Sequence, residues 1–269
     1  MGHERFRVQT IVELELLRKY TCPEYPGWQL QIPDVRRIEV FLKEFAQFEK
    51  EGDFPNFTIV YLPQDHTQGV KEGVPSPRAH VADNDLALGQ LIEAISKSRF
   101  WNETCIFVNE DDPQNGFDHV DGHRSLCLVV SPYAKRNAVV SKFYNQTAVL
   151  HTMTRMLGLP PMNQLTAGAP TMEDCFTDKP DLHAYKCVKN VIPIDEPSKK
   201  KAAMTARELK LAADLDFTKP DQIEDDDLNE LLWLAERPNE KYPKEWEGPH
   251  GRGLAALGLK ADPNAPKEK

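Results

Sequence analysis

The chain has 269 residues, 40% of them hydrophobic, and it carries 33 basic and 42 acidic side chains for a net charge of −9. This composition is typical of a globular protein, and it excludes a general electrostatic attraction to nucleic acid. No run of residues approaches the roughly 18 apolar positions of a membrane-spanning helix, so the sequence predicts no membrane span.

The five cysteines are odd in number and widely spaced, which does not favour a disulfide framework. Cys105 and Cys127 lie within apolar runs and are predicted to be unreactive core thiols. Cys175 and Cys187 are candidates for a disulfide only in an exported protein. Residues 1–9 lack the apolar core of a signal peptide, so the sequence as given predicts a cytoplasmic protein unless its true start is missing.

Two helices are predicted in the first part of the chain, over residues 8–20 and from Pro33 onward. Proline is tolerated in a first helical turn, and apolar residues follow Pro33 at helical spacing. Gly52 stands where a left-handed residue would end this helix.

Next come an apolar run at Phe57–Leu62, an amphipathic segment at 79–98 and a second apolar run at Cys105–Asn109. The two runs are short, rich in β-branched and aromatic residues and bounded by turn residues, so they predict buried strands. Strand, helix and strand in this order indicate a βαβ unit with parallel strands. A further strand is predicted at Leu126–Val130. The link before it contains no helix, so antiparallel pairing is the alternative for this strand.

The second half of the chain is predicted to be largely peripheral. A helix is expected over 144–157, followed by irregular structure over 162–198. Segments 199–215 and 225–235 are predicted to form peripheral helices. From residue 237 onward Pro, Gly and charged residues dominate, which is typical of a poorly ordered tail.

The loop between the strands at 105–109 and 126–130 is crowded with side chains that bind metals. Carboxylates packed this closely repel one another unless a cation compensates. A mixture of imidazole and carboxylate is what zinc, manganese or iron prefers. On residue types alone, a solvated acidic loop is an equally good interpretation. The side chains in question are Glu110, Asp111, Asp112, Asp118, His119, Asp121 and His123.

The predicted topology favours the metal interpretation. Sites in open α/β sheets form beyond the carboxyl ends of the strands, and the pairs Asp65-His66 and Asp111-Asp112 both stand just past such ends. The start of an antiparallel strand at 126–130 would lie at the same edge, and it would place His123, and with it His119, beside the carboxylates. The sequence therefore predicts one coordination sphere, or two adjacent ones, formed by Asp65, His66, Asp111, Asp112 and His123.

Several sequence motifs occur in order: LPQDHT at 62–67, PR at 77–78 with VADNDLALG at 81–89, EDDPQNGFDHVDGHR at 110–124, SPY at 131–133 and GLPP at 158–161. Through them, residues 25 to 176 resemble the C-terminal half of a phosphoesterase domain in the alkaline phosphatase superfamily. The resemblance is closest to bacterial phosphoesterases related to phospholipase C and acid phosphatase, relatives that are often exported.

The resemblance implies an α/β fold, with a mostly parallel sheet sandwiched by helices, and two divalent metal ions at one sheet edge. Asp65, His66 and His123 match the ligands of one ion. Asp111 and Asp112 match those of the other, with Asp112 in place of the family's usual histidine. This replacement favours manganese, calcium or iron over zinc. An extra imidazole, His119, could serve as a ligand, a general acid or a donor to a substrate oxygen.

The resemblance also implies that part of the family's domain is absent, because no stretch before Tyr25 resembles the early strand that carries the nucleophile. The expected organisation is an N-terminal remnant at 1–24, half of a phosphoesterase domain at 25–198, peripheral helices at 199–236 and a tail at 237–269. The missing half would then be a partner.

The expected function is metal-dependent hydrolysis of a phosphoester substrate by a phosphatase, phosphodiesterase or phospholipase C-like fragment that is weak or inactive alone. The alternative is a non-catalytic metal-binding or interaction remnant of that fold. A sulfatase or phosphomutase relative would share the two-metal edge but has no support from the long loop at 110–124.

Overall fold

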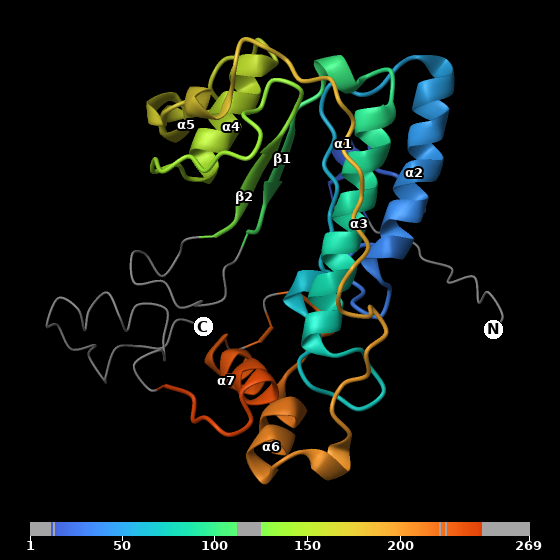
Figure 1. The fold of residues 1–269 in the computed structure, drawn as a ribbon, viewed down its shortest axis with the longest axis vertical. Coiled ribbons are helices and arrows are strands. Elements are labelled where there is room, and N and C mark those ends of the chain that lie inside the picture. Colours follow the sequence, from blue (N-terminus) through green and yellow to red (C-terminus); the bar gives the residue numbers. More distant parts are fainter. Residues whose placement is uncertain (1–11, 13, 112–124, 221, 224, 244–269) are drawn as a thin grey trace, which may run out of the picture.

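The computed structural model describes residues 12, 14–111, 125–220, 222–223 and 225–243. Its centre is a pair of long helices, α2 (Asp34–Glu51) and α3 (Pro77–Lys97), which pack side by side (Figure 1). Two short strands lie along α3, and smaller helices lie beyond the strands and at the N-terminal end of α3. No helix in the described part of the chain is long and apolar enough to cross a membrane.

The two long helices begin and end where the local sequence dictates. Pro33 stands at the N-cap of α2, and Gly52 ends it with a left-handed φ of 75° that a residue with a side chain rarely adopts. The Ser76 side chain accepts a hydrogen bond from the Ala79 N–H and caps α3, whose first residue is Pro77. Both predicted helices are therefore confirmed.

The main core lies between these helices. Phe41 and Phe45 of α2 are buried together with Leu91 and Ile95 of α3. Phe45 also contacts the rings of neighbouring aromatic residues edge-on, which extends the core past the helix ends. Burial of this much apolar surface explains why α2 and α3 form the most extensive packing in the fold.

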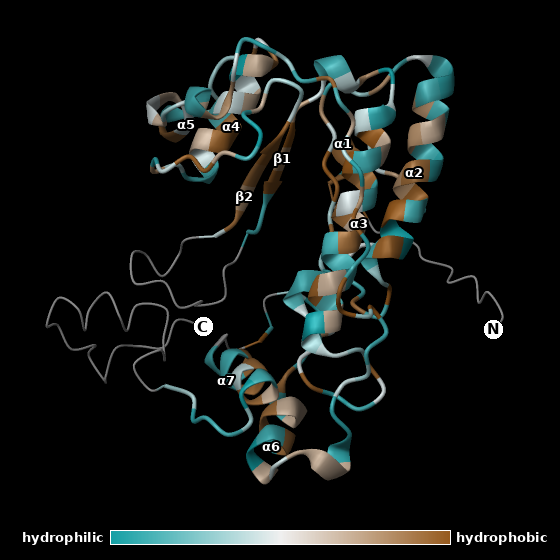
Figure 2. Cartoon of the chain, viewed as in Figure 1, coloured by the Kyte–Doolittle hydropathy of each residue, from teal (hydrophilic) through white to brown (hydrophobic). Residues whose placement is uncertain are grey.

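The strands β1 (Ile106–Asn109) and β2 (Cys127–Val130) pair antiparallel, with Ile106 opposite Val130 and Phe107 opposite Val129. The first pair packs on the α2–α3 core and the second on a smaller core beside α4 (Gln146–Met156). Figure 2 shows both strands as largely apolar, although Asn109 of β1 and the first two residues of β2 are exposed. Antiparallel pairing, the alternative for this strand, is confirmed.

The predicted fold class, a mostly parallel sheet sandwiched by helices, is wrong. Within the described residues the fold is mostly helical and its sheet has only two strands. The βαβ unit fails because residues 57–62 form no strand and pair with neither β1 nor β2. Val60 and Leu62 pack on the α2–α3 core, whereas Phe57, Ile59 and Tyr61 are 54%, 79% and 42% exposed. Alternating apolar residues predict an extended segment, but they do not supply the neighbour that a strand needs.

The smaller elements agree with the predictions in part. α1 (Glu15–Arg18) is all that the described residues contain of the helix expected over 8–20. Helix α4 is confirmed, whereas α5 (Gln164–Gly168) lies in a segment predicted to be irregular and was missed. The peripheral helices are confirmed as α6 (Ala206–Asp214) and α7 (Asp225–Glu236). Most of the predicted tail lies outside the described residues.

All five cysteines are free of disulfides, so the suggested pairing of Cys175 with Cys187 does not form. Cys105 is half-buried, and burial raises the pKa of its thiol to about 12, as expected for an unreactive thiol. The prediction for Cys127 is wrong, because this residue is exposed at the start of β2.

Candidate functional site

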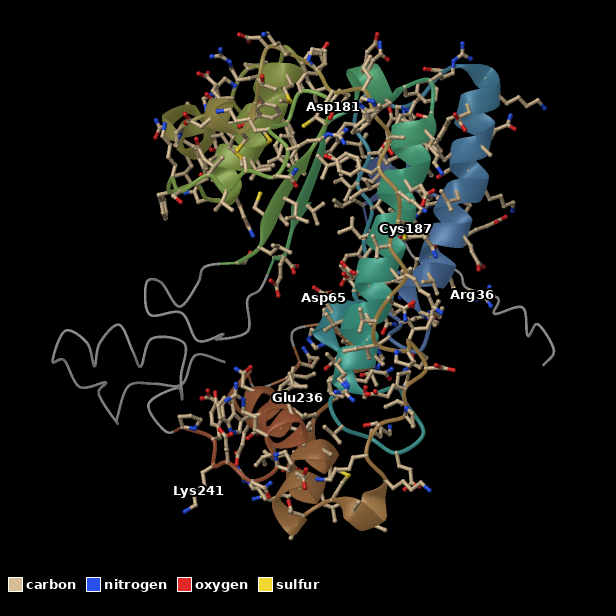
Figure 3. All side chains as sticks on the ribbon, in the orientation of Figure 1. Arg36, Asp65, Asp181, Cys187, Glu236 and Lys241 are labelled. Atoms are coloured by element: carbon tan, nitrogen blue, oxygen red, sulfur yellow. The ribbon has the colours of Figure 1, made fainter. Side chains whose placement is uncertain are left out.

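Asp65 and His66 lie in η1 (Gln64–His66), a single 3₁₀ turn that follows the extended segment 57–62. The turn ends at Thr67, whose φ of 64° lies in the left-handed region that few non-glycine residues adopt. Asp65 is exposed beside the N-terminal part of α3 (Figure 3). The side-chain amide of Asn84 in α3 donates a hydrogen bond to its Oδ1 at 3.3 Å.

A buried polar network, formed by side chains of α2 and α3, contacts this turn from the interior of the fold. Asp34 is fully buried, and its Oδ2 accepts hydrogen bonds from the Gln64 N–H at 2.9 Å and from Asn84 Nδ2 at 3.1 Å. Its Oδ1 pairs with the fully buried guanidinium of Arg37 at 3.1 Å. Asp83 accepts the backbone N–H of Asp34 at 2.5 Å, and so satisfies an amide that the first turn of α2 leaves without a partner.

The side chain of Gln64 ties the network to the preceding loop. Its Nε2 donates to the carbonyl oxygens of Leu30 at 2.8 Å and Ile32 at 2.7 Å. Its Oε1 faces Nδ1 of the buried His80, which must carry the hydrogen for this contact to be favourable. The turn is therefore held from below by polar groups of α2 and α3.

Burial controls the ionisation of this network. Desolvation raises the pKa of Asp34 to about 6, although the Gln64 N–H and the Arg37 charge oppose the rise. Desolvation lowers the pKa of His80 to about 4, so the ring is neutral at neutral pH. Its Nε2 is buried and makes no hydrogen bond.

The charge of Asp111 acts on Asp65, another predicted acidic ligand. Partial desolvation raises the pKa of Asp65, the backbone N–H groups of Asp65 and His66 oppose the rise, and the Asp111 carboxylate adds to it. Tyr61 responds to the same charge: desolvation raises its pKa to about 12, and Asp111 is the next cause. Asp111 itself is exposed just beyond β1. The Asp111 charge therefore acts on side chains at and just beyond the end of segment 57–62.

His66 is half-buried against aromatic rings. Its ring lies edge-on to Trp28, with centroids 4.8 Å apart, and to Phe217, with centroids 6.0 Å apart. Its Nδ1 is 3.3 Å from the Thr67 carbonyl oxygen. With the hydrogen on Nδ1, the lone pair of Nε2 is the one available to a metal ion.

The remaining predicted ligands, Asp112, His119 and His123, lie outside the described residues. Among the residues that are described, no three His, Cys, Asp or Glu side chains are arranged to hold a metal ion. The described part of the set has donor types that divalent cations take, the carboxylates of Asp65 and Asp111 and the imidazole of His66. The metal centre stays a prediction.

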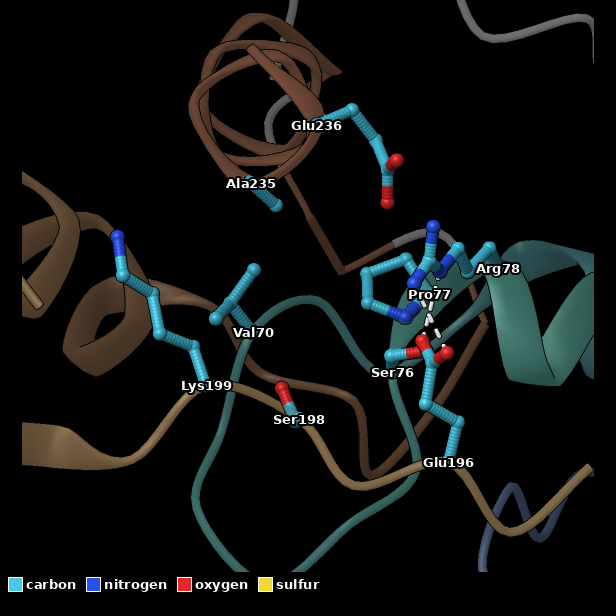
Figure 4. A pocket seen from close by; sticks show the side chains of 9 residues that line it. All are labelled: Val70, Ser76, Pro77, Arg78, Glu196, Ser198, Lys199, Ala235 and Glu236. Carbon is cyan, nitrogen blue, oxygen red and sulfur yellow. Dashed lines mark hydrogen bonds and ion pairs between the residues drawn. The ribbon is translucent and has the colours of Figure 1, made fainter. Parts of the chain in front are cut away.

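A separate pocket of about 230 Å³ lies at the start of α3 and contains none of the predicted ligands (Figure 4). Arg78 projects into it and forms two hydrogen bonds with Glu196, at 2.7 and 2.8 Å. Lys199 is paired with Glu208 at 2.8 Å. Because these cations are already compensated, the pocket offers little attraction to an anionic substrate.

The chain matches the model of the phosphoesterase family over residues 10–160, which is more than half of its length. It belongs to the phosphoesterase family. Membership implies a phosphoester hydrolase and a phosphoester substrate. Every predicted ligand, from Asp65 to His123, lies within the matched residues. No curated protein matches the chain.

Sequence reasoning gave no role to the network beneath the phosphoesterase motif at 62–67. Asp83 and Asn84 belong to a second matching motif, at 81–89, but nothing in the motif shows which residues they contact. One local signal was available: Asp34 and Arg37 are charged, lie three residues apart and stand in the first turns of an amphipathic helix. A charged pair in that position is a candidate buried ion pair.

Proposed function

We propose that this phosphoesterase-family chain is a metal-dependent phosphoester hydrolase, or the metal-binding part of one, related to phospholipase C and acid phosphatase. The proposed ligands of one or two divalent cations are Asp65, His66, Asp111, Asp112 and His123. Family membership supports the reaction class. The effect of the Asp111 charge on the pKa of Asp65 supports the location, because the two residues come from separate motifs of the family pattern.

The donor set favours hard or borderline ions. Carboxylates outnumber imidazoles among the proposed ligands, so manganese, calcium or iron is expected to bind in preference to zinc. Bound ions would stabilise the attacking and leaving oxygens of an in-line displacement at phosphorus. The chain's own residues would hold the ions, and His119 is a candidate for a further ligand, a general acid or a donor to a substrate oxygen.

Metal binding is tested through stability. Ions that bind only the folded chain should raise its free energy of unfolding, by about 2.7 kcal/mol when the free ion is at 100 times its Kd, and its melting temperature should rise as a result. We expect Mn²⁺ and Ca²⁺ to do so, and Asp112→Asn to remove most of the shift without unfolding the apo protein. Asp53→Asn, an exposed carboxylate after α2, is the matched control. An unchanged response of the Asp112 variant would remove this residue from the site.

Catalysis is tested separately with p-nitrophenyl phosphate and bis-p-nitrophenyl phosphate in the presence of Mn²⁺, Ca²⁺ or Zn²⁺. The resemblance assigns the nucleophile to none of the chain's residues, and loss of a nucleophile commonly costs several powers of ten in rate. We therefore expect very slow turnover. Turnover of roughly 1–10³ s⁻¹ would show that the chain supplies a nucleophile. A metal response without any turnover would favour the non-catalytic alternative.

A further inference from the structure

Asn84 stands between the buried network and the exposed Asp65. Its Nδ2 lies within hydrogen-bonding distance of three oxygens: the Leu62 carbonyl at 2.9 Å, Asp34 Oδ2 at 3.1 Å and Asp65 Oδ1 at 3.3 Å. Only the NH₂ end of the amide can face this group, because all three neighbours are acceptors. The amide shares its two hydrogens among these three acceptors, and the contact to Asp65 is the longest of the three.

The orientation of Asn84 is imposed from inside the fold. Asp34 is fixed by the Arg37 guanidinium and by the Gln64 N–H, and the backbone N–H of Asp34 is bound by Asp83. None of these groups is free to turn, because each has its partners in a region closed to water. The Asp34 carboxylate therefore keeps the Asn84 amide directed toward the turn.

Asn84 has the chemistry that a supporting residue for an anionic ligand requires. As a neutral donor it contacts Oδ1 of Asp65 at 3.3 Å without neutralising the carboxylate. A lysine here would compete with a cation for the charge of Asp65, and an aspartate would add a third carboxylate near Asp65 and Asp111. Groups that orient a ligand in this way commonly change metal affinity by about 10–100-fold when removed.

We propose that Asn84 is a positioning residue, which Asp34 holds in place and which fixes the Asp65 carboxylate for a divalent cation. This inference rests on the proposed function, and it adds a residue that the predicted ligand set did not contain.

The test measures the affinity of the full chain for Mn²⁺ by calorimetry, together with the melting temperature of the metal-free protein. Asn84→Ala should lower the affinity by about 10–100-fold, and Asn84→Gln, which keeps the NH₂ group, should recover part of the loss. Asp85→Ala, a change at an exposed position of the same helix, is the matched control and should leave the affinity unchanged. If Asn84→Ala does not fold, the Mn²⁺ affinity of Asn84→Gln is compared with that of Asp85→Ala instead. Equal Mn²⁺ affinities in these two variants and the parent would overturn the proposal.

A double-mutant cycle separates positioning from a general structural role. If Asn84 acts through Asp65, Asn84→Ala should cause little further loss of Mn²⁺ affinity once Asp65 has been replaced by asparagine. Equal losses in both backgrounds would overturn the proposal and leave the metal site intact. Absence of Mn²⁺ binding by the parent chain would overturn the proposed function, and this inference with it.

Discussion

Two apolar segments in this protein are each followed by acidic residues, and the structure supports the two segments in different ways. Residues 57–62 pair with no strand, yet the turn that follows them, with Asp65, is held by buried groups of α2 and α3. β1 is fully paired with β2, yet Asp111 beyond it is exposed and the Gln146 side chain reaches only its carbonyl oxygen, at 3.4 Å. Among the residues that the structure describes, a side-chain network therefore surrounds the turn with Asp65, whereas Asp111 follows a paired strand and has one long contact to its carbonyl oxygen.

The largest expected effect comes from breaking the network that holds the first segment. Arg37→Met leaves the Asp34 carboxylate buried without its cation, which should cost about 3–5 kcal/mol of unfolding free energy in urea titrations. Arg36→Met is the control, because Arg36 pairs with Glu39 on the exposed face of the same helix and such pairs contribute about 0–1 kcal/mol. Similar losses in both variants would contradict the buried network.

The second prediction concerns acid. His80 is neutral in the fold with its pKa near 4, whereas an unfolded histidine titrates near 6.5. The unfolded chain therefore binds the proton more readily, so stability from His80 is complete above about pH 6.5 and falls toward pH 4, by about 1.4 kcal/mol per pH unit. His80→Asn should remove this loss.

The effect of pH on stability through Asp34 is opposite to that through His80. The folded pKa of Asp34, about 6, lies above the ordinary value, so the stability that it contributes is lost as the pH rises through 6. Asp34 is present in both the parent and the His80→Asn variant, so the difference between their free energies of unfolding reports on the histidine. Urea titrations from pH 4 to pH 7 measure it. A difference that does not change with pH would show that His80 is accessible to protons in the fold.

A smaller effect distinguishes the two faces of residues 57–62. Val60 packs on the α2–α3 core, so Val60→Ala should cost about 1 kcal/mol. Ile59 is 79% exposed, so Ile59→Thr should change stability by less than about 0.5 kcal/mol. Thermal unfolding of both variants tests this. An equal cost at Ile59 would mean that its face is covered in solution.

The smallest effect is expected at the second segment. Gln146→Ala removes the long hydrogen bond to the Asp111 carbonyl oxygen and should change stability by less than about 0.5 kcal/mol, because both residues are exposed. The Mn²⁺ affinity should also stay within twofold of the parent, in contrast to Asn84→Ala. A tenfold loss would show that Asp111 is positioned through Gln146, and the comparison between the two segments would fail.

The amino-acid sequence by itself determined the local features of this protein. The boundaries of α2 and α3 follow from Pro33, Gly52, Ser76 and Pro77, because caps and turns depend on neighbouring residues only. The phosphoesterase motifs also belong to the sequence, and the family match confirms the membership that they indicated.

Only the tertiary structure decided which segments meet. The apolar pattern in residues 57–62 is the same whether or not a strand lies beside them, so the predicted parallel sheet failed although the pattern is present. The contacts of Asp34 with Gln64 and Asn84 could not be read from the sequence either. The pairing energy of a strand and the stability of a buried charge both depend on groups distant in the chain, and these are set only when α2, α3 and the turn pack together.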